Sequence, residues 1–573
     1  MAARHLTTDS LKLLSVALRA APSVIARTVL SVPAVPPALR ALALDADGRS
    51  AEARVQLEKL ARTRPAHLLP TVVRVAAVVH AQRAHRTALQ RLDAADVQHP
   101  ARALAHRDAG HRDRALEVLD RTGGLRARWM RERIEGERAA IAARPWEGLT
   151  PDPDAPAPRP GVVLHVVTNS LPWVQAGYTL RTLGLTTAQQ REGWHPEVAT
   201  RLGFPVDSGF LPHGTEHTVE GVPHHLLLPG SLPLGDDRAL ALHVEELTAL
   251  ARRVRPAVLH AHTRFSNAQV ALAVGRRLGI PVVYEVRGFL EETWVTRGGD
   301  PASENYHRTR EAETTCMLAA DAVTTLSETM RRVIVERGVP AERVHVLSNA
   351  APADELAAVD DPATAARGRA HRRGLGIGPE EVVLGVISSL NEYEGTEMLV
   401  HAFARHCTEH PADPGHLVVV GDGPSGSTVR AAVAALPAEF ADRVHLVGRV
   451  PHTEVPSWHA AIDLVCVPRL DTPVTRLVTP LKPLSAMAAD SPVLVSDLPP
   501  LAELVEDGRG EAVPPRVEDW AAAMGRWTRP GPEARAARER SAERAAAWVD
   551  RNATWEVVAR RSTRLYAMLT NRV

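Results

Sequence analysis

Two basic residues near an expected helix start could bind a diphosphate. Arg469 follows an apolar run, and Lys482, the last of only three lysines in the chain, lies between Pro480 and Pro483, just before the apolar stretch 484–489. Proline is tolerated in a first helical turn, so we expect a helix to begin here. Free amides at a helix start, a lysine and an arginine favour phosphate oxygens. The segment therefore predicts a diphosphate site, with charged surface residues in a loop as the alternative.

A glycine-rich turn offers a second phosphate-binding pattern. Gly421-Asp-Gly-Pro-Ser-Gly426 follows an apolar run and has the Gly-x-Gly-x-x-Gly spacing of a dinucleotide site. Pro424 removes one amide that would face a pyrophosphate, and the next expected strand ends in Gly448-Arg449 rather than in an acid for a ribose. A nucleotide contact and a tight strand-to-helix turn both stay open as interpretations.

Histidines and aspartates provide weaker metal patterns. His260 and His262 are two residues apart on an expected strand and share a face, which would allow a joint metal site, but no third ligand is evident nearby. Asp45-Ala-Asp47-Gly resembles the start of a calcium loop but lacks its later acid, so a helix cap or turn explains it better. We therefore predict no bound metal.

The elements that must position these residues belong to two α/β domains. Apolar runs alternate with helical stretches, first at 162–167, 258–262, 282–286, 322–326 and 344–347, then, after a polar interval at 351–378, at 382–387, 417–421, 444–448, 464–467 and 493–496. This alternation predicts two doubly wound, Rossmann-like domains in series. Ligands of such sheets bind beyond the carboxyl ends of the strands.

Helical sequence precedes and follows these domains. Residues 1–145 carry Ala, Leu and Arg at helical spacing, and similar phrases recur around Ala53, Ala88 and Ala115, which resembles a degenerate tetratricopeptide array that would bind a protein partner. We expect the arginine-rich run 535–544 to be a solvated helix face. The predicted divisions are a helical domain (1–145), a proline-rich linker (146–161), a first Rossmann-like domain (162–365), a second (366–540) and a C-terminal helix packing back on the first (541–573).

Composition excludes several classes of protein. The 573 residues include 68 basic and 67 acidic side chains, so no net charge favours nucleic acid. The three cysteines are too few and too widely spaced for a disulfide framework. No apolar run is long enough to span a membrane, and the apolar stretch 10–32 is either packed in its domain or faces a membrane surface. We expect a cytoplasmic protein, with at most peripheral contact at the inner face of the plasma membrane.

Several stretches between residues 162 and 512 together resemble family 4 glycosyltransferases of the GT-B fold, in particular a bacterial subgroup found with exosortase-linked polysaccharide clusters. They are Gly177-Tyr-Thr-Leu-Arg181, Val258-Leu-His-Ala-His262, Tyr-Glu285-Val-Arg287-Gly, Tyr-Glu394-Gly, Val-Gly421-Asp-Gly-Pro, Gly448-Arg449-Val450-Pro and Val478-Thr-Pro-Leu-Lys482-Pro-Leu484. The resemblance implies two Rossmann-like domains facing a cleft. It also implies a retaining transferase without metal or other cofactor, which moves a sugar from a nucleotide-sugar co-substrate to a glycan or lipid-linked acceptor in cell-surface polysaccharide biosynthesis.

The same resemblance implies roles for individual residues. Lys482 and Arg469 would contact the diphosphate, and Arg287, where many members carry a histidine, would act near the transferred sugar but not as a base. The implied donor-binding residues are Gly177, Ser389, Glu394, Gly421, Arg449, Val450, Arg476, Leu484 and Ser485. The implied acceptor-binding residues are Arg181, His262 and Glu285.

The sequence departs from the family at the expected donor site. Arg476 and Ser485 stand where members carry two glutamates, and Ser389 and Glu394 replace a basic pair. Losing a carboxylate for the ribose removes roughly 1.5 to 3 kcal/mol, and Arg476 would suit an acidic or phosphorylated donor sugar. Two alternatives stay open: a catalytically impaired, transferase-like scaffold that recruits partners through its helical domain, and, on the glycine-rich loop alone, a nicotinamide-dependent enzyme.

Overall fold

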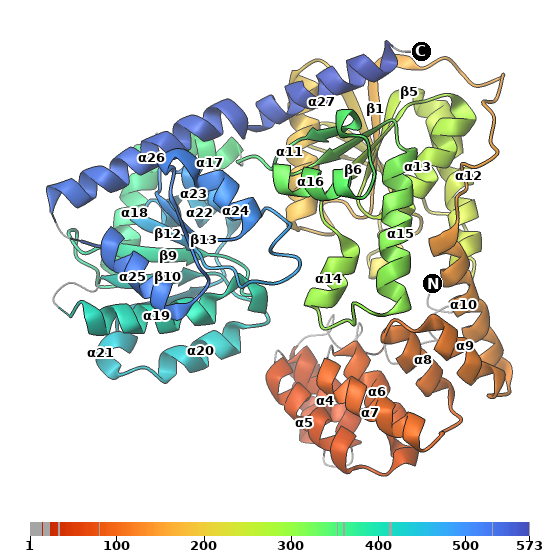
Figure 1. The fold of residues 1–573 in the computed structure, drawn as a ribbon, viewed down its shortest axis with the longest axis horizontal. Coiled ribbons are helices and arrows are strands. Elements are labelled where there is room, and N and C mark those ends of the chain that lie inside the picture. The colour runs from red at the N-terminus through yellow and green to blue at the C-terminus, as the bar shows by residue number, and fades with distance from the viewer. Residues whose placement is uncertain are drawn as a thin grey trace. The chain divides into compact units, whose positions relative to one another are not determined.

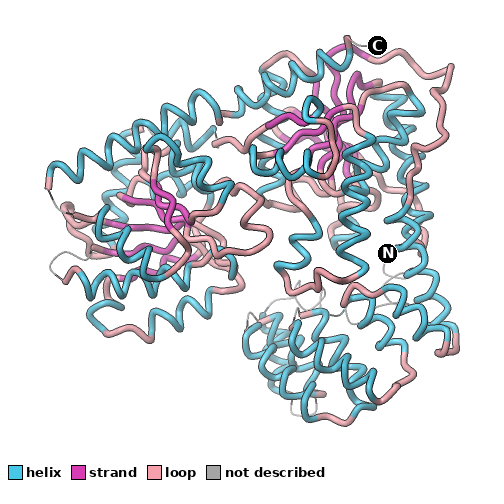
Figure 2. Tube along the Cα trace, in the orientation of Figure 1, coloured by secondary structure: helices cyan, strands magenta, loops and turns pink. Residues whose placement is uncertain are grey.

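The computed structural model describes residue 14 and residues 23–571, apart from 33–34, 48, 80, 352, 359–360, 412–414 and 530. Residues 10–13 and 15–22 of the apolar stretch 10–32 therefore lie outside the described residues. By their backbone contacts the residues form two compact units, Met1–Val174 with Pro196–Val323 and Gln175–His195 with Thr324–Val573, and each is described by itself (Figures 1 and 2).

The regular elements among the described residues of the N-terminal region, from 23 to 142, are all helices. Consecutive helices pack in pairs, α4 with α5, α6 with α7 and α8 with α9. The recurring Ala53, Ala88 and Ala115 are each fully buried on the second helix of a pair. The helices are α3 (Ser23–Ser31), α4 (Pro37–Ala46), α5 (Ser50–Thr63), η1 (Ala66–Leu68), α6 (Leu69–Val78), α7 (Gln82–Ala94), α8 (Pro100–Asp108), α9 (Arg112–Asp120) and α10 (Leu125–Ala142).

This helical region is hydrogen-bonded to the first α/β domain within the same unit. Gln269 Nε2 donates to the Ala140 and Ala143 carbonyls at 2.9 and 2.8 Å, at the end of α10. Arg112 Nη1 donates to Asn305 Oδ1 at 2.9 Å. The segment predicted as a linker is anchored too, since Asp152 N donates to the Arg277 carbonyl at 2.8 Å. The predicted boundary at 161/162 lies inside strand β1, which begins at Arg159.

The first sheet has eight strands in the order β3-β4-β2-β1-β5-β6-β7-β8. The five strands predicted from apolar runs are confirmed, and β2, β3 and β4 are additional, because short strands with polar residues give no apolar run. The strands are β1 (Arg159–Val167), β2 (His195–Thr200), β3 (Glu216–Val219), β4 (Val222–His225), β5 (Pro256–His262), β6 (Val282–Val286), β7 (Ala322–Thr325) and β8 (Val344–Val346). The accompanying helices are α11 (Gly177–Arg191), η2 (Val206–Ser208), α12 (Asp236–Val254), α13 (Phe265–Leu278), α14 (Leu290–Thr296), α15 (Glu304–Ala319), α16 (Glu328–Glu336) and η3 (Ala341–Arg343).

The second sheet has six strands in the order β11-β10-β9-β12-β13-β14, and the pairs recorded along it are parallel. The strands are β9 (Val383–Ile387), β10 (His416–Val420), β11 (Val444–Gly448), β12 (Leu464–Val467), β13 (Val493–Ser496) and β14 (Glu511–Val513). The helices are α17 (Ala353–Ala358), α18 (Pro362–Gly374), η4 (Glu392–Glu394), α19 (Thr396–Glu409), α20 (Gly426–Ala434), α21 (Ala438–Ala441), η5 (His452–Glu454), α22 (Val455–His459), α23 (Lys482–Ala488), α24 (Pro499–Val505), η6 (Glu506–Gly508) and α25 (Val517–Trp527). Apolar clusters cover both faces, as a buried parallel sheet requires.

Two predicted boundaries of the second domain fall inside helices. The 365/366 division lies in α18, which packs on α22, and the 540/541 division lies in α26 (Pro532–Asn552), which packs on α23. The chain turns instead at 553–554. Helix α27 (Trp555–Thr570) then packs on α11, where the Trp555 ring occupies the space that a side chain at Gly184 would need.

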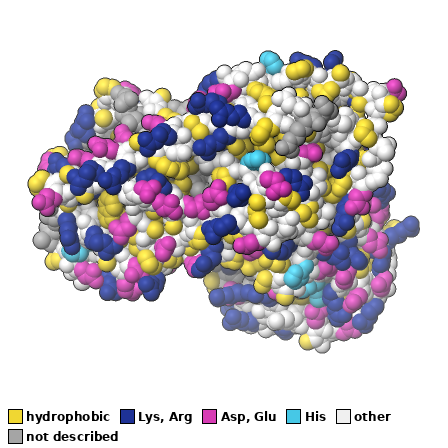
Figure 3. Space-filling model, turned by 45° about the horizontal axis from the view of Figure 1, so that its top comes forward, with side chains coloured by type: hydrophobic (Ala, Val, Ile, Leu, Met, Phe, Trp, Pro, Cys, Tyr) yellow, Lys and Arg dark blue, Asp and Glu magenta, His cyan; other side chains and the backbone are white. Residues whose placement is uncertain are grey.

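The surface carries charges of both signs, as the nearly equal numbers of basic and acidic residues predict. Basic and acidic side chains are interspersed on the face seen in Figure 3. Within the described part of the chain, no helix is both long and apolar enough to cross a membrane.

Candidate functional site

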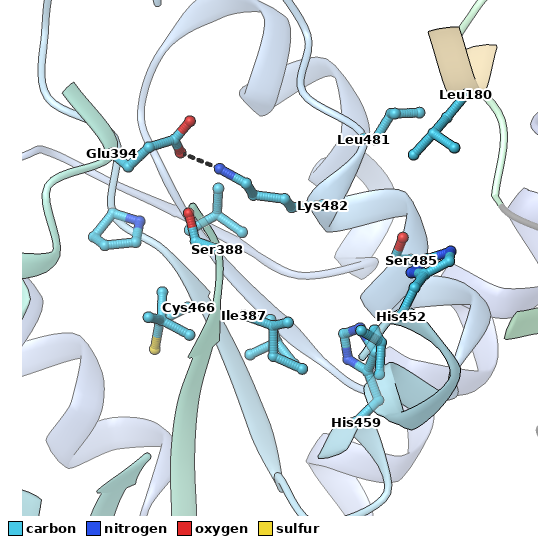
Figure 4. Close-up of a pocket in the computed structure, with 15 residues that line it drawn as sticks. Leu180, Ile387, Ser388, Glu394, His452, His459, Cys466, Leu481, Lys482 and Ser485 are labelled. Atoms are coloured by element: carbon cyan, nitrogen blue, oxygen red, sulfur yellow. Dashed lines mark ion pairs between the residues drawn. The ribbon is translucent and has the colours of Figure 1, made fainter. Parts of the chain in front are cut away.

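A pocket of about 160 Å³ lies in the second unit, beyond the carboxyl ends of β9 and β12 (Figure 4). Residues 386–388 of the first strand end and 465–468 of the second line it, together with residues of η5, α22 and α23 and with Leu180 of α11. Gly177, the first residue of α11, lies beside Leu481. The pocket therefore occupies the position where ligands of parallel sheets bind.

Helix α23 begins at Lys482, with Pro483 in its first turn, as the prolines predict. Leu484, Ala486 and Met487 are buried in the core beneath the helix. This packing fixes the side of the helix that faces the pocket, where Lys482 and Ser485 lie one turn apart. Leu484 itself is a core residue, so its side chain does not line the predicted donor site.

Two basic side chains, Lys482 from the pocket lining and Arg469 from outside it, gather around one carboxylate of the lining. Glu394 is buried, and its Oε2 lies 2.7 Å from Lys482 Nζ and 3.5 Å from Arg469 Nε. Arg469 Nη1 also donates to the Val478 carbonyl at 2.9 Å, and its guanidinium lies 5.5 Å from the centre of the Tyr393 ring. Burial lowers the pKa of Lys482, and the Glu394 carboxylate opposes this shift. Two cations on one carboxylate leave a local excess of positive charge, which favours an anionic ligand.

A close backbone approach holds Glu394 in place. Gly395 has φ +71°, and a side chain there would meet the Pro468 carbonyl oxygen, 1.8 Å from an ideal Cβ position. Only glycine fits both conditions without strain. The turn at Gly395 thus brings the end of η4 against the end of β12, and Glu394 against α23.

The glycine-rich loop is a tight turn in which four amides donate to other groups of the protein. Within the described loop, Gly421 N donates to the Gly448 carbonyl at 2.8 Å, Ser425 N to the Leu390 carbonyl at 2.8 Å and Gly426 N to the Gly423 carbonyl at 2.9 Å. Gly423 N donates to Asp422 Oδ1 at 2.8 Å. These amides are not directed at a ligand, so the structure favours the turn over a pyrophosphate cradle. A side chain at Gly421 would meet the carbonyl oxygen of Ser388, so packing requires a glycine at this position.

Other predicted donor-site residues lie outside the pocket lining. Arg476 is exposed and forms an ion pair with Asp471 at 2.5 Å, outside the residues that line the pocket. Ser389 and Arg449 are exposed, and Val450 is half-buried against the core. Of the residues that line the pocket, only Glu394, Lys482 and Ser485 were predicted as site residues. The lining residues that were not predicted include Leu180, Ser388, His452 and His459.

Arg181 was predicted to bind an acceptor, but the structure gives it a different position. Its side chain is fully buried, and its guanidinium donates to the carbonyls of Leu347 and Ser348, both at 2.7 Å, and to Asn349 Oδ1 at 3.2 Å. The amide of Asn349 donates in turn to the Thr479 carbonyl at 2.9 Å. Arg181 is therefore connected through Asn349 to the loop that precedes Lys482, and its buried side chain is not exposed to a ligand.

A second polar cluster lies in the first unit at the ends of β5 and β6. The Arg287 guanidinium contacts the Glu285 carboxylate and His262 Nδ1, and Glu285 and His262 are fully buried. Burial, and next the nearby Arg287, hold the pKa of His262 well below its usual range, so this ring is neutral. The predicted residues Arg287, Glu285 and His262 are thus brought together, and the two buried side chains anchor the guanidinium.

A third histidine completes the pair noted in the sequence. His165 on β1 is in register with His260 on β5, and ligand atoms of His165, His260 and His262 all lie within 4.8 Å of one another. His165 Nδ1 and His262 Nε2 already form a 2.9 Å hydrogen bond. The Arg287 cation on His262 makes the cluster unfavourable for a divalent metal, because like charges repel. A hydrogen-bonded core explains this group better.

Comparisons with known proteins cover both domains that carry these clusters. Residues 176–350 match the model of the glycosyl transferase 4-like domain, and residues 381–529 match that of glycosyl transferases group 1. The chain belongs to the family 4 glycosyltransferases. Arg287 and Glu285 lie in the first matched segment of this glycosyltransferase, and Glu394, Arg469 and Lys482 lie in the second.

Relatives and solved structures agree with this membership. The glycosyltransferase is 25% identical over 366 residues to D-inositol 3-phosphate glycosyltransferase of Jonesia denitrificans, covering 61% of this chain and 82% of the relative. It is 29% identical over 146 residues to the lipopolysaccharide core mannosyltransferase LpsB of Rhizobium meliloti, covering 24% and 38%. Its fold matches Anabaena HepE in complex with UDP (TM-score 0.55, 17% identity, 71% of this chain and 99% of that one) and Arabidopsis starch synthase IV bound to ADP and acarbose (0.54, 16%, 72% and 99%). These neighbours identify the fold as GT-B.

Proposed function

We propose that this glycosyltransferase binds a nucleoside-diphosphate sugar in the pocket at the start of α23 and transfers its sugar to a glycan or lipid-linked acceptor with retention of configuration. The observation that carries the proposal is the Lys482–Glu394–Arg469 cluster at the pocket. HepE structures with UDP and UDP-glucose support a nucleotide-sugar donor. The similarity to a lipopolysaccharide core mannosyltransferase supports a role in cell-surface polysaccharide biosynthesis.

The cluster suits the charge that develops during such a transfer. As the bond from the sugar to the diphosphate breaks, negative charge grows on the phosphate oxygens. Lys482 and Arg469 supply fixed positive charge there, in a partly buried site where electrostatic interactions are strong. Glu394 keeps both cations in position when the pocket is empty. In this proposal the departing diphosphate is stabilised by side chains, without a metal ion.

Arg287 supplies a second anchored cation in the first domain. Contacts with Glu285 and the neutral His262 hold its guanidinium in one orientation, so little conformational freedom is lost when it meets a ligand. Arginine stays protonated at neutral pH and cannot remove a proton from the acceptor. We therefore assign Arg287 an electrostatic role toward oxygens of the transferred sugar or its phosphate, with Glu285 and His262 as positioning residues.

A panel of nucleotide sugars tests the proposal. UDP-, GDP- and ADP-linked hexoses are incubated with the enzyme, and release of the nucleoside diphosphate is followed with water and with candidate glycans as acceptors. We expect one donor to be consumed faster than in the K482A variant, with product of the same anomeric configuration as the donor by NMR. An inverted product would contradict retention. Absence of both turnover and binding for every donor would instead favour the scaffold alternative, in which the pocket has lost its substrate.

A further inference from the structure

His459 is a buried histidine that lines the pocket and is not used by the proposed phosphate site. It ends α22, and only 3% of its surface is exposed. Among the residues that the structure describes, its Nδ1 atom has no hydrogen-bond partner. Buried polar atoms nearly always have such a partner, so part of the hydrogen-bonding capacity of this ring is left unused by the protein, on a side chain that lines the pocket.

The neighbours of His459 on the same short helix face another way. Trp458 stacks on the ring of His371 in α18, with centroids 4.0 Å apart and planes 9° from parallel. Ser457 Oγ forms a 2.9 Å hydrogen bond with His371 Nε2. These two contacts attach α22 to α18 and so fix the opposite direction, that of His459, toward the pocket.

The side of the pocket near His459 differs chemically from the side near Lys482. In Figure 4 the labelled His459, His452 and Ser485 lie on one side of the view, and the Lys482–Glu394 ion pair lies on the other. Burial lowers the pKa of His459 to about 4, so its ring is uncharged at neutral pH, with one donor and one acceptor nitrogen. Imidazole and hydroxyl groups of this kind complement ligand hydroxyls rather than phosphates.

The spacing along α23 connects the two sides. Ser485 follows Lys482 by three residues and lies on the same helix face. A nucleotide with its diphosphate at Lys482 has its ribose directly adjacent, because the ribose is bonded to the phosphate. We infer that His459 donates to or accepts from a ribose hydroxyl of the donor nucleotide, together with Ser485, and is a further specificity-determining residue. The inference rests on the proposed function, since it requires a nucleotide in this pocket.

Calorimetric titration of ribose-modified nucleotides tests the inference. UDP, ADP and GDP are titrated into the wild-type chain, followed by the 2′-deoxy and 3′-deoxy forms of the tightest of the three. We expect the wild type to prefer the ribonucleotide over at least one deoxy form by about tenfold. H459L should bind the ribonucleotide about tenfold more weakly and lose this preference, whereas H459Q should retain part of it.

A matched control and the failing outcomes separate the two proposals. H401L removes an exposed histidine of α19 and should leave every affinity unchanged. If the wild type binds ribonucleotide and both deoxy forms equally, the inference is wrong even if H459L fails to fold. The same follows if H459L is folded by circular dichroism and keeps the preference. If the wild type binds none of the three nucleotides, the proposed function itself fails, and the inference with it.

Discussion

Lys482 Nζ lies 2.7 Å from Glu394 Oε2, across the junction of two elements that are 88 residues apart in the sequence. Arg469 Nε lies 3.5 Å from the same carboxylate oxygen, so one acid is shared by two cations. The carboxylate of η4 therefore holds the positive charges of Lys482 and Arg469 together without cancelling both. This arrangement explains why a carboxylate at this position is compatible with an anion site.

Replacing Glu394 by Gln tests the pairing of this carboxylate with Lys482 and Arg469. The variant leaves Lys482 and Arg469 without their shared carboxylate, so we expect the empty protein to lose about 1 to 3 kcal/mol of stability, less than for a fully buried pair because Lys482 is 27% exposed. A bound diphosphate would replace the lost charge, so the thermal shift produced by the nucleotide should be larger than in the wild type. An unchanged melting temperature, or a smaller ligand shift, would contradict the pairing.

The turn at Gly395 should be intolerant of a side chain. G395A meets both the positive φ and the Pro468 carbonyl, so we expect a loss of about 2 kcal/mol or more and weakened nucleotide binding. G374A is the matched control, because Gly374 ends α18 with open space around its Cβ position and an ordinary φ. Urea unfolding of the two variants compares them directly. Equal midpoints would show that the close approach does not constrain the turn.

The two charged clusters should affect different steps. R287A removes the anchored guanidinium of the first domain, and we expect sugar transfer to fall by about 100-fold or more while nucleotide affinity stays unchanged. R287K keeps the charge without the planar fork and should recover only part of the rate. R476A, which removes an exposed arginine paired with Asp471, should change neither quantity. Steady-state kinetics and calorimetry on the same samples measure the transfer rate and the nucleotide affinity. Separate roles for the two clusters would be contradicted if R287A weakened nucleotide binding as much as catalysis.

Buried neutral histidines predict a loss of stability in mild acid. Burial lowers the pKa to about 4 in His85, His243 and His459 and to about 3 in His224, from 6.5 in an unfolded chain. Below pH 6.5 the unfolded state therefore binds more protons, and each histidine costs on the order of 1 to 2 kcal/mol by pH 5. The stability they contribute is complete above pH 6.5 and falls as the pH approaches 4. H243Q should reduce the difference in urea midpoint between pH 7.5 and pH 5, and H67Q, at an exposed position, should not.

Much of the fold follows from the sequence because buried parallel strands are continuous apolar runs. The ten strands expected from such runs are present, whereas β2, β3, β4 and β14 are short and partly polar and give no comparable signal. The division at 161/162 falls inside β1, because the strand begins at Arg159, before the apolar run at 162–167. The divisions at 365/366 and 540/541 fall inside α18 and α26, where the helical sequence continues across them.

The site could be predicted only in part. Proline spacing located Lys482 at the start of α23, but the pairing with Glu394 depends on the turn at Gly395, which no local pattern reveals. Burial decided the remaining roles: Arg181 proved to be a buried support, Arg476 an exposed ion pair, and His459 a pocket residue. His165 completes the histidine cluster only through the register of β1 and β5.

The most direct test of the central claim is nucleotide binding by K482A compared with K59A. Lys482 lines the pocket, and Lys59 is an exposed lysine of α5 in the helical region, so the two variants remove the same charge from different places. Calorimetric titration with the tightest of UDP, GDP and ADP is performed on both variants and on the wild type. We expect K482A to lose at least tenfold in affinity and K59A to match the wild type. Equal affinities of K482A and the wild type would contradict a diphosphate site at the start of α23.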